Sequence, residues 1–122
     1  MQFPNWHRRL LQAMGIVPTN SRLDFLAAWA QAEGGTARFN PLNTTEKVPG
    51  SKAYNSAGVQ HYSDALQGIA ATLLTLRLHY YDRLRAALAA DGISALEILS
   101  RSTSDVRTWG TNPNTIRRVL GG

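Results

Sequence analysis

The chain has 122 residues, of which 43% are hydrophobic and 17% charged, and this composition is typical of a globular protein. The length fits a single domain over residues 1–122 that is large enough to bury a core. Because the chain has no cysteine and no apolar run near the roughly 18 residues of a transmembrane helix, disulfides, thiolate metal sites and membrane insertion are excluded. The net charge of +5 favours anionic polymers as partners.

Two helices are predicted in the first third of the chain. Large apolar side chains recur at helical spacing over residues 5–14 and over residues 21–33, which gives each segment one face for the core. Ser21 followed by Asp24 is typical of a capping box at the start of the second helix. Gly34-Gly35 is a natural terminator, so this helix is expected to end at the glycine pair.

The segment from residue 36 to residue 62 follows neither the helical nor the strand period. Turn signals are closely spaced in it, among them Asn40-Pro41, Pro49-Gly50 and Ser56-Ala57-Gly58. Short strands or a hairpin are predicted near residues 53–60. A connection of this length inside a small domain is usually functional, so we expect a binding site in this polar insertion.

The second half of the chain is predicted to be helical. Ser63-Asp64 opens the helix with the clearest apolar face, and a further helix over residues 80–90 is either separate from it or continuous through a kink. Shorter helices are predicted over residues 94–101, 103–109 and 114–120. In the helix that opens at Ser63-Asp64, the expected core positions are Leu66, Ile69, Ala70, Leu73 and Leu76. The fold class is therefore mostly α, with a long polar loop or hairpin insertion.

Glu33 is the first candidate for chemistry. It falls on the last turn of the second predicted helix, where the negative end of the helix dipole disfavours a charged carboxylate. Trp29 lies one turn earlier on the same face, and partial desolvation would raise the pKa of the carboxyl further. A general acid that works near neutral pH needs such a pKa. Position alone leaves a solvated glutamate at a helix end equally open.

Four segments together resemble a known family. In order, they are Trp29-Ala-Gln-Ala-Glu33-Gly34-Gly35, Phe39-Asn40-Pro41-Leu42-Asn43-Thr44-Thr45, Tyr54-Asn55-Ser56-Ala57-Gly58-Val59-Gln60-His61-Tyr62 and Gln67-Gly68-Ile69-Ala70-Ala71-Thr72. This run is similar to the lysozyme-like domains of phage endolysins and virion-associated murein hydrolases, and more distantly to lytic transglycosylases and goose-type lysozymes. Two departures are visible: Gly34 stands where transglycosylases usually have serine, and Gly58-Val59-Gln60 is shorter than their Gly-Leu-Met-Gln.

The resemblance implies a lysozyme-like α+β fold and an enzyme that cleaves peptidoglycan glycan strands. The bond would lie between N-acetylmuramic acid and N-acetylglucosamine, and cleavage would be hydrolytic or by transglycosylation. Glu33 would be the general acid, and no cofactor is implied. The protein would be a monomer or part of a longer phage tail or lysin chain. Because residues 1–9 lack the apolar stretch of a secretory signal, we expect it to reach the bacterial cell wall from a phage virion or by release from the host cytoplasm.

A second catalytic carboxylate is the usual requirement of a glycosidase, as nucleophile or as base for a water. Among the remaining acidic residues only Glu46 and Asp64 border the insertion. Asp64 stands where a helix N-terminus favours an acid for structural reasons, and Glu46 stands beside Lys47 in a turn-rich stretch. A mechanism with Glu33 as the only carboxylate is also open, in which the substrate's own N-acetyl or hydroxyl group completes the displacement.

Polar and aromatic residues of the insertion are candidates for sugar contacts. Amides and hydroxyls bond sugar hydroxyls, and a tyrosine ring stacks on a pyranose. The alternative for the loop residues is turn chemistry, and the alternative for the tyrosine beyond the insertion is core packing. The candidate substrate-binding residues are Thr45, Asn55, Ser56, Gln60, Tyr62 and Tyr81.

Three other functions are weighed against cleavage of the wall. A zinc site is not expected, because His7, His61 and His79 lack metal-ligand spacing. A non-catalytic module for cell-wall binding or for a phage tail would keep the fold without the chemistry. Binding of nucleic acid is suggested by charge alone, and the scattered arginines argue against it.

Overall fold

The computed structural model describes residues 3–122. Within that range it is mostly helical with one small antiparallel hairpin, as predicted. The elements in chain order are α1 (Trp6–Ala13), α2 (Asn20–Glu33), β1 (Lys52–Ala53), β2 (Gln60–His61), α3 (Ala65–Leu76), the 3-10 helix η1 (His79–Tyr81), α4 (Asp82–Ala89), α5 (Ala95–Trp109) and α6 (Pro113–Val119). No helix in this part of the chain is long and apolar enough to cross a membrane.

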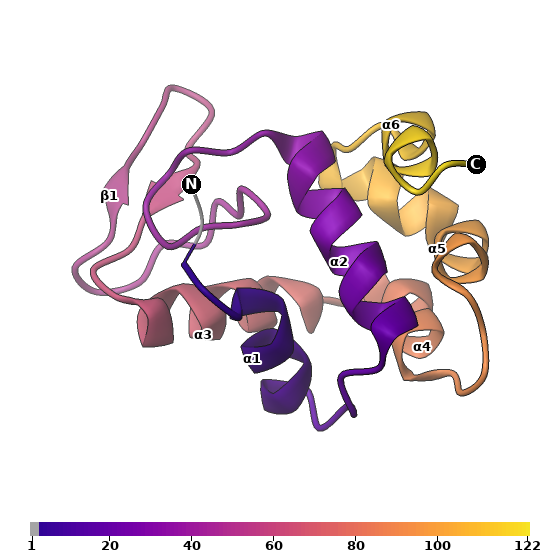
Figure 1. Ribbon diagram of the computed structural model, residues 1–122. Coiled ribbons are helices and arrows are strands. Elements are labelled where there is room, and N and C mark those ends of the chain that lie inside the picture. The colour runs from indigo at the N-terminus through magenta and orange to yellow at the C-terminus, as the bar shows by residue number, and fades with distance from the viewer. Residues whose placement is uncertain (1–2) are drawn as a thin grey trace.

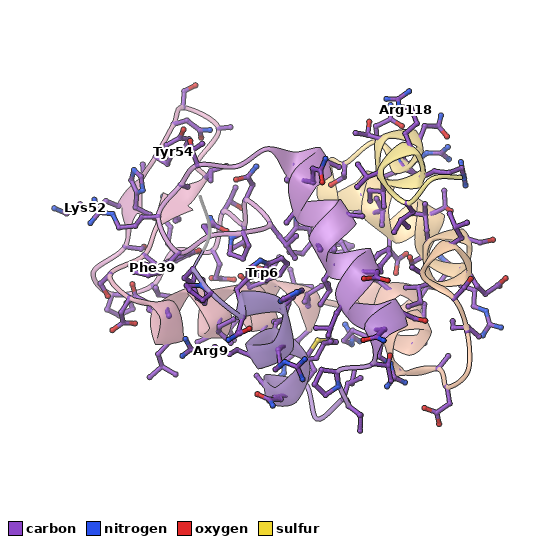
Figure 2. The ribbon with its side chains drawn as sticks, in the orientation of Figure 1. Trp6, Arg9, Phe39, Lys52, Tyr54 and Arg118 are labelled. Atoms are coloured by element: carbon purple, nitrogen blue, oxygen red, sulfur yellow. The ribbon has the colours of Figure 1, made fainter. Side chains whose placement is uncertain are left out.

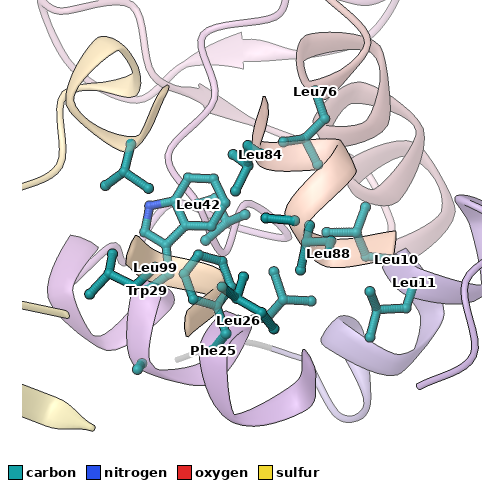
Figure 3. Close-up of a cluster of buried hydrophobic side chains, with 14 of the residues drawn as sticks. Leu10, Leu11, Phe25, Leu26, Trp29, Leu42, Leu76, Leu84, Leu88 and Leu99 are labelled. Carbon is teal, nitrogen blue, oxygen red and sulfur yellow. The ribbon is translucent and has the colours of Figure 1, made fainter. Parts of the chain in front are cut away.

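Helix α2 runs through the middle of the molecule (Figure 1). The hairpin and its loops lie on one side of it, together with α1 and α3, and α4, α5 and α6 lie on the other. Phe25, Leu26 and Trp29 of α2 are fully buried, and they meet leucines from both sides in one core (Figure 3). Since the apolar face of α2 is shared by two groups of elements, the position of its last turn is set by both.

The two ends of α2 differ in how well the sequence predicts their caps. The helix begins one residue earlier than expected, and Thr19 is its N-cap: the side-chain oxygen accepts a hydrogen bond from the backbone N–H of Arg22 at 3.4 Å. The predicted capping box of Ser21 and Asp24 is therefore wrong, because Ser21 is already inside the helix. The other end is as predicted, with Gly34 in the left-handed region at φ 60° and its N–H bonded to the carbonyl of Ala30.

Helix α3 buries a different face from the one that its leucines indicate. Leu66 is 72% exposed and Ala70 is also exposed, so the predicted core positions are wrong at these two residues, whereas Ile69 and Leu76 are buried as predicted. The cause is Gly68, where an added Cβ would lie 1.9 Å from the backbone oxygen of Phe39. Because of this close approach, the face of α3 that carries Gly68 packs against the insertion, and the face that carries Leu66 is exposed to solvent.

The later helices differ from the prediction in their boundaries. The segments 94–101 and 103–109 form a single helix, α5, in which the hydroxyl of Ser102 donates to the carbonyl of Ile98 at 2.7 Å. Ser102 thus satisfies its own polar group within the helix and causes no break. Helix α4 is separate from α3, because Leu78 between them is extended at ψ 146°.

The insertion is organised by a buried amide. Asn40 is fully buried, and its Nδ2 donates to the backbone oxygens of Thr44 at 2.8 Å and Gln60 at 2.9 Å, while its Oδ1 accepts from the N–H of Thr44 at 2.9 Å. Asn40 therefore joins the loop after α2 to the second strand of the hairpin. The hairpin itself pairs Lys52 with His61.

Replacing Gly68 by alanine tests this packing. Helix propensity alone predicts that Gly68→Ala stabilises the protein by about 1 kcal/mol. The close approach to Phe39 predicts the opposite, a loss of about 2 kcal/mol in the free energy of unfolding, because a backbone must move. Urea denaturation measures the difference, with Ala70→Gly at an exposed position of α3 as the control for propensity. A stabilised Gly68→Ala protein would contradict the observed packing.

Candidate active site

Glu33 is the last residue of α2, and its side chain is half-buried at the surface between α2 and the C-terminal helices. Its Oε2 accepts a hydrogen bond from the hydroxyl of Thr111 at 2.7 Å. The same hydroxyl oxygen accepts from the indole Nε1–H of Trp29 at 2.9 Å. An indole nitrogen only donates, so the single hydroxyl hydrogen of Thr111 is directed to Glu33. The three residues form a hydrogen-bond chain with a fixed direction, from Trp29 through Thr111 to Glu33.

Thr111 reaches this position through the end of α5. Gly110 adopts φ 104°, its N–H donates to the carbonyl of Arg107 at 2.9 Å, and the N–H of Thr111 donates to the carbonyl of Val106 at 3.1 Å. These two bonds are the Schellman arrangement that glycine permits at a helix end. The chain is folded back over α5, and Thr111 is 5% exposed beneath Glu33.

A cluster of aromatic rings packs around Trp29, the residue from which the hydrogen-bond chain to Glu33 begins. The ring of Trp109 stands edge-on to Trp29 at 5.0 Å between centroids and to Tyr81 at 5.1 Å. The Nε1–H of Trp109 donates to the carbonyl of Leu42 at 2.7 Å, which ties the loop after α2 to α5. Trp29 of this cluster is joined to Glu33 through the hydroxyl of Thr111, so the rings help to fix the hydrogen-bond chain that ends on the carboxyl.

Asn43 closes the other side of Glu33. It adopts φ 58°, a left-handed conformation that asparagine tolerates, and its Nδ2 donates to the backbone oxygen of Glu33 at 3.3 Å. An added Cβ at Gly35 would lie 2.2 Å from Oδ1 of Asn43, so only glycine at this position leaves room for the amide. The glycine pair thus ends α2 at Gly34 and admits Asn43 at Gly35.

Burial raises the pKa of the Glu33 carboxyl above its ordinary value of 4.5. Hydrogen bonds from the side chains of Thr111 and Asn43 stabilise the anion and offset part of that rise. Burial is the largest effect, so the direction predicted from the sequence agrees with the structure. The carboxyl is held in one place and kept neutral to a higher pH than a solvated glutamate, which suits a proton donor.

The two other predicted carboxylates have different surroundings. Asp64 is exposed and is the N-cap of α3, where its Oδ1 accepts from the N–H of Gln67 at 2.8 Å. Glu46 is partly exposed in the insertion, and its backbone oxygen accepts from the hydroxyl of Tyr62 at 2.6 Å. Among residues 3–122 neither carboxylate hydrogen-bonds to Glu33, so the structure joins no second acid directly to it.

Gln60 and Tyr62 have their polar groups occupied within the insertion. Gln60 is 2% exposed, its Nε2 donates to the carbonyl of Gly58 at 2.8 Å, and its Oε1 accepts from Ser51 at 2.9 Å. Tyr62 is equally buried, and burial and the charge of Glu46 raise the pKa of its hydroxyl. These contacts give both residues a role in holding the loops, and a direct sugar contact by either stays a prediction.

The remaining predicted binding residues divide into two groups. Thr45, Asn55 and Ser56 are exposed on the insertion, although Oδ1 of Asn55 also accepts from the N–H of Val59 at 3.1 Å and so stabilises the hairpin turn. Tyr81 is 7% exposed and packs on Trp109, which is the core role that was weighed for it.

Residues that the sequence analysis missed complete the site. Thr111 and Trp109 lie far from Glu33 along the chain, and no local pattern connects them with it. Tyr54 lies in the hairpin, its hydroxyl hydrogen-bonds to the hydroxyl of Thr36, and its ring stands edge-on to His61 at 4.9 Å. Thr36 follows the glycine pair by one residue, so this bond connects the segment after Glu33 to the hairpin.

The described part of the chain offers no ligand set for a metal. Within residues 3–122 no group of three or more His, Cys, Asp or Glu side chains is placed to hold an ion. No protein-family model, curated protein or solved structure is significantly similar to this chain.

Substitution of Thr111 tests the hydrogen-bond chain. Thr111→Val leaves the indole N–H of Trp29 without a partner and removes the donor to Glu33, so we expect a loss of about 1–3 kcal/mol in the free energy of unfolding. It also raises the pKa of Glu33 further, because a bond to the anion is lost. Thr111→Ser keeps the hydroxyl and is the control. Equal free energies of unfolding in the Val and Ser variants would contradict the hydrogen-bond chain from Trp29 through Thr111 to Glu33.

The pH dependence of stability tests the burial of Glu33. Below pH 4.5 the carboxyl is protonated in the folded and the unfolded chain. As the pH rises through the raised pKa, folding must keep an ionised carboxyl half-buried, which lowers the free energy of unfolding of the wild type. Glu33→Gln does not ionise. Its stability relative to wild type, from urea denaturation, should therefore increase from pH 4.5 upward and then level off; a constant difference would contradict the raised pKa.

Proposed function

We propose that this chain is a peptidoglycan-degrading glycosidase, a lysozyme-like muramidase or a lytic transglycosylase, with Glu33 as general acid. The observation that supports this most is a half-buried carboxyl at a helix end whose pKa is raised by burial and whose Oε2 is fixed by Thr111. An acid that stays protonated in one fixed position is suited to protonating a leaving group. The ordered segments around Glu33, which resemble those of phage lysins, point to the glycan of the bacterial wall as substrate.

The proposed first step is protonation of the glycosidic oxygen by Glu33. Because Thr111 donates to Oε2, the proton of the neutral carboxyl belongs on Oε1, which is the oxygen we assign as donor. The proton moves to the bridging oxygen, the bond from that oxygen to C1 of the N-acetylmuramic acid breaks, and the N-acetylglucosamine leaves with a new hydroxyl. The electron pair of the broken bond remains on that oxygen, and positive charge develops at C1.

The second step returns the proton to Glu33. Its carboxylate takes a proton from the group that attacks C1, which is water in a hydrolase or the sugar's own 6-hydroxyl in a transglycosylase. Both paths restore the acid without a second protein carboxylate. In this single-acid scheme the products of the reaction identify the attacking group.

The proposed glycan contacts lie on the exposed side of the insertion. Thr45, Asn55 and Ser56 present polar groups there, and Tyr54, 41% exposed, presents an aromatic ring that is joined to the Glu33 segment through Thr36. The net charge of +5 suits an anionic wall. In this proposal the protein comes from a phage virion or is released from the host cytoplasm, and it acts alone or within a longer tail or lysin chain.

The second candidate is a non-catalytic module that binds the wall or belongs to a phage tail. The observation that favours it is the engagement of Asp64 in capping α3 and of Gln60 in the hairpin, because both side chains then serve the fold. Such a module would bind wall and cleave nothing.

Clearing of purified peptidoglycan tests the proposal. Wild type should reduce turbidity, and Glu33→Gln, which keeps the size and the hydrogen bond to Thr111, should retain less than about one hundredth of the rate because the proton donor is lost. Mass spectrometry of the products separates reducing ends from 1,6-anhydro ends. Wall binding without clearing by either protein, on several wall types, would support the binding module instead.

The pH profile of clearing carries a second prediction. Because the first step requires protonated Glu33, activity should fall as the pH rises through the raised pKa of this carboxyl. In Thr111→Val, the falling limb should move to higher pH, since a bond to the anion is removed. An alkaline limb that stays in place in this variant would contradict Glu33 as the acid.

A further inference from the structure

A cavity lies on the hairpin side of the molecule. Its volume is about 290 Å³, and it is lined by Arg38, Gly50, Lys52, His61, Tyr62 and Ser63. The lining comes from separate segments: the loop after α2, the turn before β1, both strands and the residue before the cap of α3. Figure 2 shows Lys52 reaching out from the hairpin on the side away from α2, so this cavity is distinct from the surroundings of Glu33.

The charged side chains that line this cavity are both basic. Arg38 and Lys52 are the charged residues of its lining, and no acidic side chain lines it. Neither residue forms an ion pair within the described residues, although Arg22, Arg83, Arg85 and Arg101 all do. The acid next along the chain, Asp64, has its Oδ1 bonded to the N–H of Gln67. Among the described residues, therefore, no direct ion pair occupies either cation.

The framework of the cavity is held by hydrogen bonds. The N–H of Arg38 donates to Nδ1 of His61 at 2.9 Å, and the N–H of Tyr62 donates to the carbonyl of Arg38 at 2.9 Å. Gln67 donates from Nε2 to the carbonyl of Pro49 at 2.8 Å and accepts from the N–H of Ser63 at 2.9 Å, which joins the turn to the start of α3. The backbone that carries the cations is thus fixed before any ligand arrives.

His61 supplies a third donor. An imidazole whose Nδ1 accepts a hydrogen bond carries its proton on Nε2. Lys52 is the cross-strand partner of His61, so the ammonium and the imidazole belong to neighbouring positions of the hairpin. Guanidinium, ammonium and imidazole N–H together are the donors that bind phosphate and carboxylate oxygens.

We propose that this cavity binds an oxyanion, a phosphate or a carboxylate, through Arg38, Lys52 and His61. Arg38 lies five residues after Glu33, so the Cα atoms of the two are at most about 18 Å apart. If the proposed function holds, on which this extension rests, the anion is carried by the wall polymer whose glycan is cleaved at Glu33. The cavity then holds an anionic substituent of the wall beside the reacting strand.

Titration with inorganic phosphate and with acetate, followed by amide chemical shifts in NMR, tests the cavity without any wall. Shifts at Arg38, His61 and Ser63 should saturate, and Lys52→Gln or Arg38→Gln should weaken binding by about tenfold. Arg118→Gln removes the same charge from α6, on the opposite side of the molecule in Figure 2, and should bind as wild type does. Shifts that do not saturate, or an equal loss in Arg118→Gln, would overturn the proposal.

Sedimentation with purified walls identifies the source of the anion. The Glu33→Gln protein is used so that no strand is cleaved, with and without Lys52→Gln, on walls that keep or lack their phosphodiester polymers. Binding that depends on Lys52 only on intact walls assigns phosphate, and equal dependence on both walls assigns carboxylates. No dependence on Lys52 on either wall overturns the link to the wall. Saturable phosphate binding by a protein that clears no wall overturns the proposed function and leaves the cavity standing.

Discussion

The directed hydrogen-bond chain from Trp29 through Thr111 to Glu33 is the constraint on which the site depends. It joins a buried residue of α2 to a residue beyond the end of α5, and it ends on a carboxyl that is partly removed from water. The indole N–H can only donate, so the hydroxyl of Thr111 must accept from Trp29 and donate to Glu33. Burial raises the pKa of this carboxyl, and the chain fixes its position while offsetting part of that rise.

The insertion between α2 and α3 is held by internal bonds, and this changes which residues are available for binding. Asn40, Gln60 and Tyr62 are buried and satisfy backbone or side-chain partners within the loops. Their role is to fix the exposed surface that the hairpin presents. The groups that the insertion leaves exposed to a ligand include those at the hairpin surface and the two cations of the cavity, Arg38 and Lys52.

Local patterns predicted much of the fold. The presence of helix α2, its end at Gly34, the cap at Asp64 and the small hairpin follow from periodicity, from glycine and from capping chemistry. The rotation of α3 was not predictable, because Leu66 satisfies the apolar pattern while the decisive contact is between Gly68 and the backbone of Phe39. That contact is invisible to a rule based on side-chain hydropathy.

The sequence indicated Glu33 as the candidate acid of the site, but it did not indicate Thr111, the residue that holds this carboxyl in place. Glu33 is marked by its place before two glycines, whereas Thr111 is brought to it by a helix end that lies 78 residues further along the chain. The predicted helix over residues 103–109 ends just before Gly110, but the sequence does not show which element this helix end packs against. Sequence also left the binding roles of Gln60 and Tyr62 open, since burial decides how their polar groups are used.

The most direct test of the account is the titration of the Glu33 carboxyl carbon by NMR, in wild type and in Thr111→Val. The account predicts a pKa above 4.5 in wild type and a higher pKa in the variant. In each protein, the alkaline limb of peptidoglycan clearing should lie at the pKa measured for Glu33 in that protein. A carboxyl that titrates at or below 4.5, or that titrates independently of Thr111, would contradict the proposal that this half-buried glutamate is the proton donor.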